Sequence, residues 1–299
     1  MDNVIIQKFN KAIETNLYHY YWKQLRLFDW EKRIEERKNE VARCKTMLET
    51  FELLTDVDLH NKQFLDIGCG WGGFLAAAAL KGANVKGCDI HPEVLHIAKM
   101  RLSIQNSEGF FFTALAEQLP VADKSMDIIV CISVIEHVNN VGKVINEISR
   151  VLKDDGIAWL QLPNYWIPVE PHYKILFPPK CPKPLAKIWL LLFGKPVQFI
   201  DSINYTDHAW IISECKKNNF YIYDINNAPK IKYIPKELKT NIRYKSKLNF
   251  IYHRLLNYCT QLIEKYWKIM FKVDRINYIV SRSVIENTYM KPLLKAYRI

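Results

Sequence analysis

The stretch FLDIGCGWGG, at residues 64–73, decides the fold. Residues 64–67 predict a buried strand, the glycines after them predict a tight turn, and FLAAAAL at 74–80 predicts the helix that follows. Glycine suits such a turn because a Cβ would keep the backbone away from a ligand, and the first N–H groups of the helix are free to bind an anion. A second run, NVKGCD, ends at Asp89, whose carboxylate can accept hydrogen bonds from both hydroxyls of a ribose. Together the two runs predict an α/β fold that binds an adenosine-containing cofactor.

Two classes of cofactor fit the glycine pattern. Gly68, Gly70 and Gly73 match G-x-G-x-x-G, and Asp89 lies at about the distance that a nicotinamide dinucleotide site requires. Asp66, however, stands two residues before the first glycine, where a carboxylate would repel a pyrophosphate. S-adenosylmethionine carries an α-ammonium and a sulfonium group, so an acid at this position suits it. The residues therefore favour S-adenosylmethionine over a dinucleotide.

The pattern Asp66-x-Gly68-x-Gly70-x-Gly72 resembles motif I of the class I S-adenosylmethionine-dependent methyltransferases. The resemblance continues in the family's order over about a third of the chain, residues 64–164, and includes SVIEHV at 133–138, which resembles the loop that lines the transfer site. It implies a Rossmann-like, doubly wound, mostly parallel seven-stranded sheet with N-terminal helices and two inserted segments. Leu115 occupies the slot where many members have an adenine-binding Asp, so backbone groups of the next two residues are expected to bind the adenine. The cofactor-binding residues that the resemblance implies are Asp66, Gly68, Cys69, Gly70, Gly72, Asp89, Ile90, Ala116, Glu117 and Ser133.

The chain divides into four expected regions. Residues 1–60 form a helical cap, 61–227 the Rossmann-like core with an acceptor-side insertion at 164–202, 228–275 a basic helical insertion, and 276–299 the last strand and a tail. In the family the N-terminal segment packs over the cofactor and helps to close the acceptor site. Its aromatic residues Tyr18, Tyr20, Tyr21 and Trp22 either line that site or simply pack in the cap. We predict strands at 63–68, 84–89, 109–113, 127–132, 155–162, 220–226 and 276–282, and core helices at 71–81, 92–106, 140–152 and 203–218.

Composition indicates a cytoplasmic protein. The chain of 299 residues is 49% hydrophobic, which is enough for one large core with additions or for two modest domains. Its seven cysteines are scattered without a C-x-x-C pair, so neither a zinc knuckle nor a disulfide framework is expected. The N-terminus lacks the pattern of a signal peptide, and the apolar run IWLLLF at 188–193 is too short to span a bilayer.

The net charge of +11 lies entirely in the last quarter of the chain. From residue 230 onward there are 16 lysines and arginines against four acidic residues. Such a block indicates a polyanionic neighbour, or else a solvated basic face. Two segments combine lysines with apolar residues: the insertion around 173–196, and an amphipathic stretch at 248–273. We expect a small-molecule or lipid-linked acceptor and contact with an anionic surface on the inner face of the membrane, and we favour nucleic acid less; no oligomeric state is predicted.

Histidines supply the candidate general bases, because their pKa lies near neutrality. The catalytic candidates are His137 in SVIEHV and His172 with Glu170 in the segment after the fifth strand; His208, beside Asp207, is a further candidate. The SVIEHV loop resembles that of ubiquinone-pathway O-methyltransferases, in which an acid precedes a Glu-His pair and a divalent cation can bind. Here Ser133 replaces that acid, and two ligands are too few for a Mg²⁺ site. We therefore predict no metal.

Three functions remain open from the sequence. The leading one is S-adenosylmethionine-dependent O-methylation of a hydroxyl on a small-molecule, lipid-linked, quinone-like or glycan-precursor acceptor. The second is methylation of RNA held by the basic C-terminal region, although no RNA-binding module is recognisable. The third is a non-catalytic scaffold that binds S-adenosylmethionine, which the intact Asp66, Gly68, Gly70 and Asp89 disfavour.

Overall fold

The computed structural model describes residues 3–206, 208–227 and 275–285. Seven strands form one sheet in the order β3-β2-β1-β4-β5-β9-β8. Five of them are parallel to one another: β1 (Gln63–Ile67), β2 (Asn84–Asp89), β3 (Phe110–Thr113), β4 (Met126–Ile132) and β5 (Leu152–Pro163). The strand β9 (Arg275–Ser281) lies antiparallel between β5 and β8 (Tyr221–Asp224). The predicted Rossmann-like, seven-stranded sheet is confirmed, whereas the expected basic insertion lies outside the described residues apart from its last residue.

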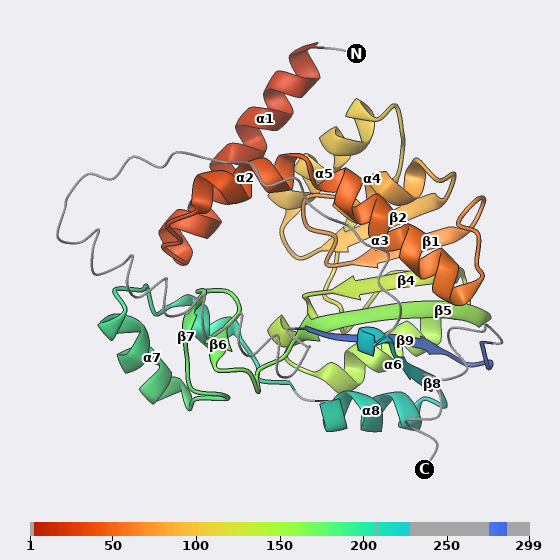
Figure 1. Cartoon of the computed structure of the whole chain (residues 1–299). Coiled ribbons are helices and arrows are strands. Elements are labelled where there is room, and N and C mark those ends of the chain that lie inside the picture. Colours follow the sequence, from red (N-terminus) through yellow and green to blue (C-terminus); the bar gives the residue numbers. More distant parts are fainter. Residues whose placement is uncertain (1–2, 207, 228–274, 286–299) are drawn as a thin grey trace.

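The centre of the sheet is buried on both faces, as the nearly continuous apolar runs of β1 and β4 require. On one face, Phe64 and Ile128 pack in a core with helices α3 (Glu40–Thr55), α4 (Gly73–Ala79) and α5 (Pro92–Ile104). On the other, Leu65 and Ile129 pack with helices α6 (Val141–Val151) and α8 (His208–Lys217). Figure 1 shows the resulting arrangement of helices on either side of the sheet.

The order of the strands reverses between β1 and β4, and it is at such a point that open α/β sheets bind ligands. The carboxyl ends of both strands lie at the same edge of the sheet, because β1 and β4 are parallel. The glycine turn follows β1, and the loop with Glu136 and His137 follows β4. The fold therefore brings the predicted cofactor turn and one catalytic candidate to a single edge.

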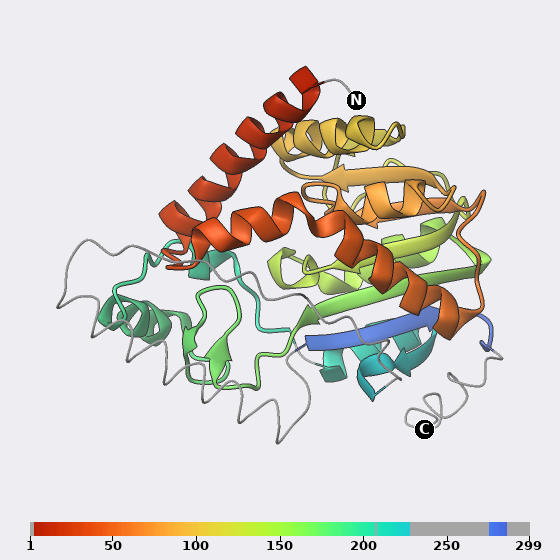
Figure 2. The same ribbon diagram turned by 45° about the horizontal axis from the view of Figure 1, so that its top comes forward.

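Two further segments lie beyond this edge of the sheet. The N-terminal cap begins with α1 (Asn3–Tyr18), a π-helical turn η1 (His19–Gln24) and α2 (Trp30–Lys38). The insertion after β5 contains the hairpin β6 (Val169–Glu170) and β7 (Ile175–Leu176), then α7 (Lys183–Leu192) and η3 (Phe199–Ser202). The two segments share a third apolar core, so they pack together although far apart in sequence. Figure 2 shows both at the end of the sheet toward which its parallel strands point.

Helix α7 is apolar on both of its faces. Its inner face is buried through Ala186 and Leu190, and the indole N–H of Trp189 donates to the Leu176 carbonyl oxygen at 2.8 Å. On the outer face, four large apolar side chains are between 57% and 66% exposed: Leu185, Ile188, Leu191 and Leu192. In the described part of the chain, none of the helices combines the length and the apolar character that crossing a bilayer would need.

The helix predicted at 203–218 begins later than expected, at His208. Asn204 prevents an earlier start, because its backbone N–H donates to the Glu136 carbonyl oxygen at 2.7 Å and its side-chain amide donates to the Val138 carbonyl oxygen at 2.6 Å. These bonds hold the segment before α8 against the loop that follows β4. The non-helical segment before α8 thus connects the insertion to the candidate site.

A buried arginine connects the cap to the glycine turn. The guanidinium of Arg101, on α5, donates to the carbonyl oxygens of Trp71 at 2.6 Å, Lys38 at 3.0 Å and Arg37 at 2.8 Å. It also lies 3.2 Å from the carboxylate of Glu40, and both of these side chains are almost fully buried. Three carbonyl groups thus depend on this one cation for a hydrogen bond, and it shares the charge of Glu40 with Arg37, which lies 2.7 Å from the same carboxylate.

We predict that Arg101→Met lowers the free energy of unfolding by about 3–5 kcal/mol, because it removes one of the two close cations of a buried carboxylate and leaves three carbonyl groups without their donor. Lys32→Met is the matched control, since the pair of Lys32 with Glu36 is exposed and 3.8 Å long. Urea denaturation of both variants measures the difference. Equal, small changes in the two variants would show that the Arg101 network does not stabilise the fold.

Candidate functional site

The glycine turn has the backbone conformation that its sequence predicts. Gly68, Gly70 and Gly72 have φ angles of 67°, 51° and 80°, which L side chains rarely adopt. At Gly70 a Cβ would meet no atom within 4 Å, so this part of the turn faces open space. The backbone of the turn is therefore accessible to a ligand.

Asp89, at the end of β2, fixes this turn. One oxygen of its carboxylate accepts the Gly70 N–H at 3.1 Å, and the other accepts the His91 N–H at 3.0 Å. Each carboxylate oxygen can accept more than one hydrogen bond, so acceptor capacity remains for the ribose that the sequence predicts. Asp89 is thus oriented before any ligand arrives.

Asp66 is a buried acid at the same edge. Burial raises the pKa of its carboxyl group well above the usual value, and the nearby carboxylates of Asp89 and Glu40 raise it further. A cation beside Asp66 would offset both effects. The α-ammonium group of S-adenosylmethionine is such a cation, so this acid fits the predicted cofactor better than it fits a pyrophosphate.

The loops after β2 and β3 contain the residues expected near the adenine. Ile90 and Leu115 are apolar and more than half exposed, which suits contact with a flat ring. The carboxylate of Glu117 accepts the N–H groups of Asn139 at 2.8 Å and Asn140 at 3.3 Å, so this side chain holds the loop before α6. Adenine recognition by the backbone at 116–117 remains a prediction.

Two of the remaining predicted cofactor residues are fixed by backbone bonds. The N–H of Cys69 donates to the Cys88 carbonyl oxygen at 2.9 Å, which attaches the turn to β2. Ser133 has a φ of 58° and donates its N–H to the Gln161 carbonyl oxygen at 2.8 Å. A left-handed serine at a strand end stores strain of the kind that concentrates at functional sites.

The N-terminal cap packs against the glycine turn. The indole N–H of Trp71 donates to the Asn16 side-chain oxygen at 2.8 Å, and the Arg37 guanidinium lies 5.4 Å from the Trp71 ring. The ring of Tyr20 lies 6.3 Å from Trp71 and 5.6 Å from Phe199 on η3. Of the aromatic cluster in the cap, Tyr20 thus lies between the turn and the insertion. Tyr18, Tyr21 and Trp22 contact other residues of the cap.

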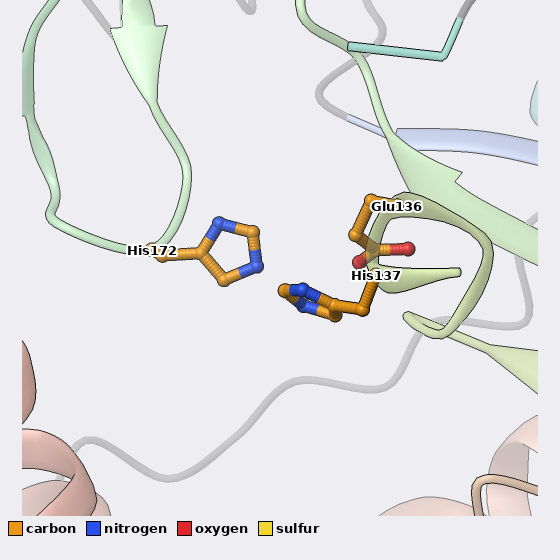
Figure 3. A group of neighbouring side chains, drawn as sticks. All are labelled: Glu136, His137 and His172. Atoms are coloured by element: carbon orange, nitrogen blue, oxygen red, sulfur yellow. The ribbon is translucent and has the colours of Figure 1, made fainter. Parts of the chain in front are cut away.

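The catalytic candidates lie together (Figure 3). Glu136 and His137 belong to the short helix η2 (Ile135–His137) after β4, and His172 belongs to the turn between β6 and β7. The centroids of the two imidazole rings lie 5.3 Å apart. The centroid of the Phe199 ring lies 5.7 Å from that of His137 and 5.4 Å from that of His172. The sequence predicted His137 and His172 as two separate candidates. The structure brings them into one cluster. The side chain of His208 lies outside the described residues.

Glu170 orients His172. One oxygen of its buried carboxylate lies 3.0 Å from His172 Nδ1, and the other accepts the N–H groups of His172 at 2.7 Å and Tyr173 at 2.6 Å. Burial alone would lower the pKa of His172, but Glu170 outweighs it and the pKa is raised. The pair is a carboxylate–imidazole dyad whose Nε2 remains free for chemistry.

Glu136 is the residue of this cluster that sequence reasoning used least. Its side chain is fully buried, and neither carboxylate oxygen has a hydrogen-bond partner among the described residues. Burial raises its pKa to about 7, although the nearby His172 acts in the opposite direction. Buried polar groups almost always have partners. Its unsatisfied oxygens therefore point to a ligand that the cluster is built to receive.

The prediction of no metal counted two ligands, Glu136 and His137. His172 adds a third, and one ligand atom from each of these three residues lies within 4.8 Å of the others. Two imidazoles and a carboxylate can coordinate a divalent ion. The cluster can therefore either take a proton from a bound hydroxyl or hold a cation.

Residues 65–160 match the sequence model of the methyltransferase domain family. The chain is 30% identical over 159 residues to the ubiquinone biosynthesis O-methyltransferase of Rickettsia typhi and 33% identical over 112 residues to that of Dechloromonas aromatica. These alignments cover 53% and 36% of this chain, and 60% and 47% of the two relatives. The chain thus matches about half of the length of these curated relatives.

Among solved structures, the chain is similar to the magnesium protoporphyrin IX methyltransferase of Synechocystis, which was crystallised with S-adenosylhomocysteine. The similarity has a TM-score of 0.51 and 15% sequence identity, and it covers 94% of this chain and 100% of the other. At this identity the likeness supports the fold.

We predict that Asp89→Ala weakens binding of S-adenosylmethionine and S-adenosylhomocysteine by about tenfold to a hundredfold, because a charge-assisted hydrogen bond contributes about 1.5–3 kcal/mol. Asp58→Ala is the matched control, since Asp58 also accepts the N–H two residues ahead but lies away from the turn. Calorimetry measures both affinities. Unchanged affinity in Asp89→Ala would remove this residue from the site, and binding of NAD by the wild type would contradict the cofactor assignment.

Proposed function

We propose that this chain, which carries a class I S-adenosylmethionine-dependent methyltransferase domain at 65–160, transfers a methyl group to a hydroxyl oxygen of a hydrophobic, lipid-linked acceptor. The observation that carries the proposal is the cluster of Glu136, His137 and His172 at the edge of the sheet where the glycine turn lies. A hydroxyl must lose its proton to become a good nucleophile, and a cluster of carboxylates and imidazoles serves that step.

When bound, S-adenosylmethionine supplies a methyl carbon that leaves sulfur as it bonds to the acceptor oxygen. The chain itself aligns the reactants and receives the proton of the hydroxyl. Glu170 holds the ring of His172 through Nδ1, so Nε2 is the atom of this ring that would receive the proton. The ring of Phe199 contacts both histidines and keeps this side partly apolar.

Oxygen is the acceptor atom that the cluster favours. An amine whose pKa lies near neutrality needs no strong base, whereas an alcohol or phenol does. The O-methyltransferase names of the two relatives agree with this choice, as a property of those proteins.

We predict that His172→Gln lowers turnover by a factor of about 10²–10⁴ at saturating S-adenosylmethionine, because the cluster loses the group that Glu170 orients. His96→Gln is the matched control, as His96 is an exposed residue on α5. Affinity for S-adenosylmethionine, measured by calorimetry, should be unchanged in both variants. If His172→Gln transfers methyl groups at the wild-type rate, this cluster takes no part in proton removal.

The outer face of α7 supports the lipid-linked acceptor. Its four exposed apolar side chains lie near Lys180 and Lys187, two cations of the kind that an anionic bilayer attracts, although Lys187 also pairs with Asp201 at 2.9 Å. The ammonium of Lys183 is directed inward, where it donates to the carbonyl oxygens of Ile200 and Ile203. The helix lies against η3, whose Phe199 contacts the two histidines. An acceptor anchored in a bilayer under α7 would therefore have a short path to the cluster.

We predict that the protein binds anionic vesicles more tightly than neutral ones, and that part of this binding survives high salt because buried apolar side chains are not screened. Replacing Leu185, Ile188, Leu191 and Leu192 with Ser should abolish the salt-resistant part and leave cofactor affinity unchanged. Leu190 is excluded from this set, because it is fully buried and its replacement would damage the core.

Co-sedimentation with vesicles measures this binding, and the same assay with RNA in place of vesicles tests the alternative. A nucleic-acid site needs cations and a few stacking rings, and its binding falls steeply with salt. If the protein ignores vesicles of either composition but binds RNA at low salt, the bilayer proposal is wrong and RNA becomes the favoured acceptor.

A further inference from the structure

We propose that Glu136, His137 and His172 bind one divalent transition-metal ion, such as Zn²⁺, in a site completed by the insertion after β5. The ion binding does not depend on the acceptor; only its use in catalysis rests on the proposed function. Two residues come from η2 and the third from the β6–β7 turn, so the site exists only in the folded chain.

The first observation is the set of side chains around each histidine. A metal-binding histidine almost always gives its second ring nitrogen to a carboxylate or a backbone carbonyl. Here His172 Nδ1 lies 3.0 Å from the Glu170 carboxylate, and His137 Nδ1 lies 3.2 Å from the Ser202 carbonyl oxygen. Both rings are thus held through Nδ1, which leaves both Nε2 atoms for an ion.

The second observation is the carboxylate of Glu136. It is fully buried, has no hydrogen-bond partner among the described residues, and lies beside both histidines (Figure 3). A buried carboxylate without a partner is costly, because it has lost its hydration without compensation. A divalent ion would provide that compensation directly, and it would do so better than a neutral hydroxyl.

The third observation is that the site is accessible and close to the right size. His137 is exposed, which gives an ion a path from solvent. Ligands held about 2.0–2.2 Å from an ion lie at most about 4.4 Å apart. The three ligand atoms lie within 4.8 Å of one another, so small side-chain rotations bring them to an ion.

The donor set selects the class of ion. Mg²⁺, Ca²⁺ and Mn²⁺ prefer oxygen ligands, whereas imidazole suits Zn²⁺, Cu²⁺, Fe²⁺ and Ni²⁺. With two nitrogen donors and one carboxylate, the site should bind Zn²⁺ more tightly than Mg²⁺. Three protein ligands also leave a coordination position open, as in catalytic rather than structural sites.

An ion at this position would perform the step that the proposed function requires. A hydroxyl bound to a divalent ion loses its proton to solvent more readily, and the oxygen is then able to attack. The histidines would act as ligands, and Glu170 would become a positioning residue that orients His172. Ser133 stands where the resembled loop has an acid, and His172 would supply the ligand that this replacement removes.

The test uses full-length protein stripped with EDTA and titrated with Zn²⁺, Mn²⁺ or Mg²⁺ chloride in a calorimeter. We expect one ion per chain, with Zn²⁺ binding at least about tenfold more tightly than Mg²⁺. Co²⁺ should bind at the same site and give the visible absorption of a nitrogen- and oxygen-ligated ion. Wild-type protein without saturable binding of any of these ions would overturn the proposal.

Variants locate the ion. Glu170→Gln should weaken binding by about 10–100-fold, as losses around a metal ligand do, and His172→Ala should weaken it further. His96→Ala, which removes an exposed histidine elsewhere, should bind like the wild type. Circular dichroism and affinity for S-adenosylmethionine establish that each variant is folded. Equal ion affinity in His172→Ala and wild type would overturn the site.

Activity separates this proposal from the function on which its catalytic role rests. If ion-free protein methylates its acceptor at the full rate, the ion has no part in transfer and the imidazoles act as bases, while the proposed function stands. If the ion binds as expected but no hydroxyl acceptor is methylated under any condition, the proposed function fails and the metal site stands.

Discussion

The buried guanidinium of Arg101 is the contact on which the candidate site depends most. It bonds to the glycine turn through Trp71 and to the junction of α2 and α3 through two carbonyl groups, and it shares the charge of Glu40 with Arg37. Glu40 in turn packs so closely on the first residue of α4 that a Cβ at Gly73 would lie 2.7 Å from its carboxyl carbon. The close approach of the cap to the turn therefore requires that residue 73 has no side chain and that the two arginines balance the charge of Glu40.

A second constraint acts at the same edge of the sheet. Asp66 lies near the end of β1, and Glu136 lies in η2 after the neighbouring strand β4. Both carboxylates are buried, and burial raises the pKa of both. Charges placed in this way reduce stability until a ligand compensates them. The chain concentrates this cost where a cationic cofactor and, in our proposal, a metal ion would bind. The two buried carboxylates that lower the stability of this edge are thus the groups that a cofactor and an ion would bind.

Much of the fold could be predicted from the sequence, because its strands are short apolar runs and its glycine turn has a specific spacing. The elements built on local patterns, such as β1, β2 and α6, lie within two residues of the predicted positions. The start of α8 could not be predicted, since it depends on bonds from Asn204 to a loop that lies more than 60 residues earlier. Long-range contacts of this kind leave no periodic signal.

The candidate site shows the same limit. His137, His172 and Glu170 could be named from the sequence, because histidine exchanges protons near neutral pH and these residues follow the fourth and fifth predicted strands. Their meeting could not be predicted, because His172 lies in an insertion whose path depends on a core shared with the N-terminal cap. The isolation of the Glu136 carboxylate was also hidden, since burial and missing partners are properties of packing and not of sequence.

We propose that this edge of the sheet transfers a methyl group from S-adenosylmethionine to a hydroxyl of a lipid-linked acceptor. This transfer can be measured by incubating the protein with S-adenosylmethionine tritiated in its methyl group and a cell extract, and then separating lipids, polar metabolites and nucleic acids. We expect label in the lipid fraction as a methyl ether, and its loss when His172 is replaced by Gln. Label in nucleic acid, or label in lipid that does not depend on His172, would contradict this proposal.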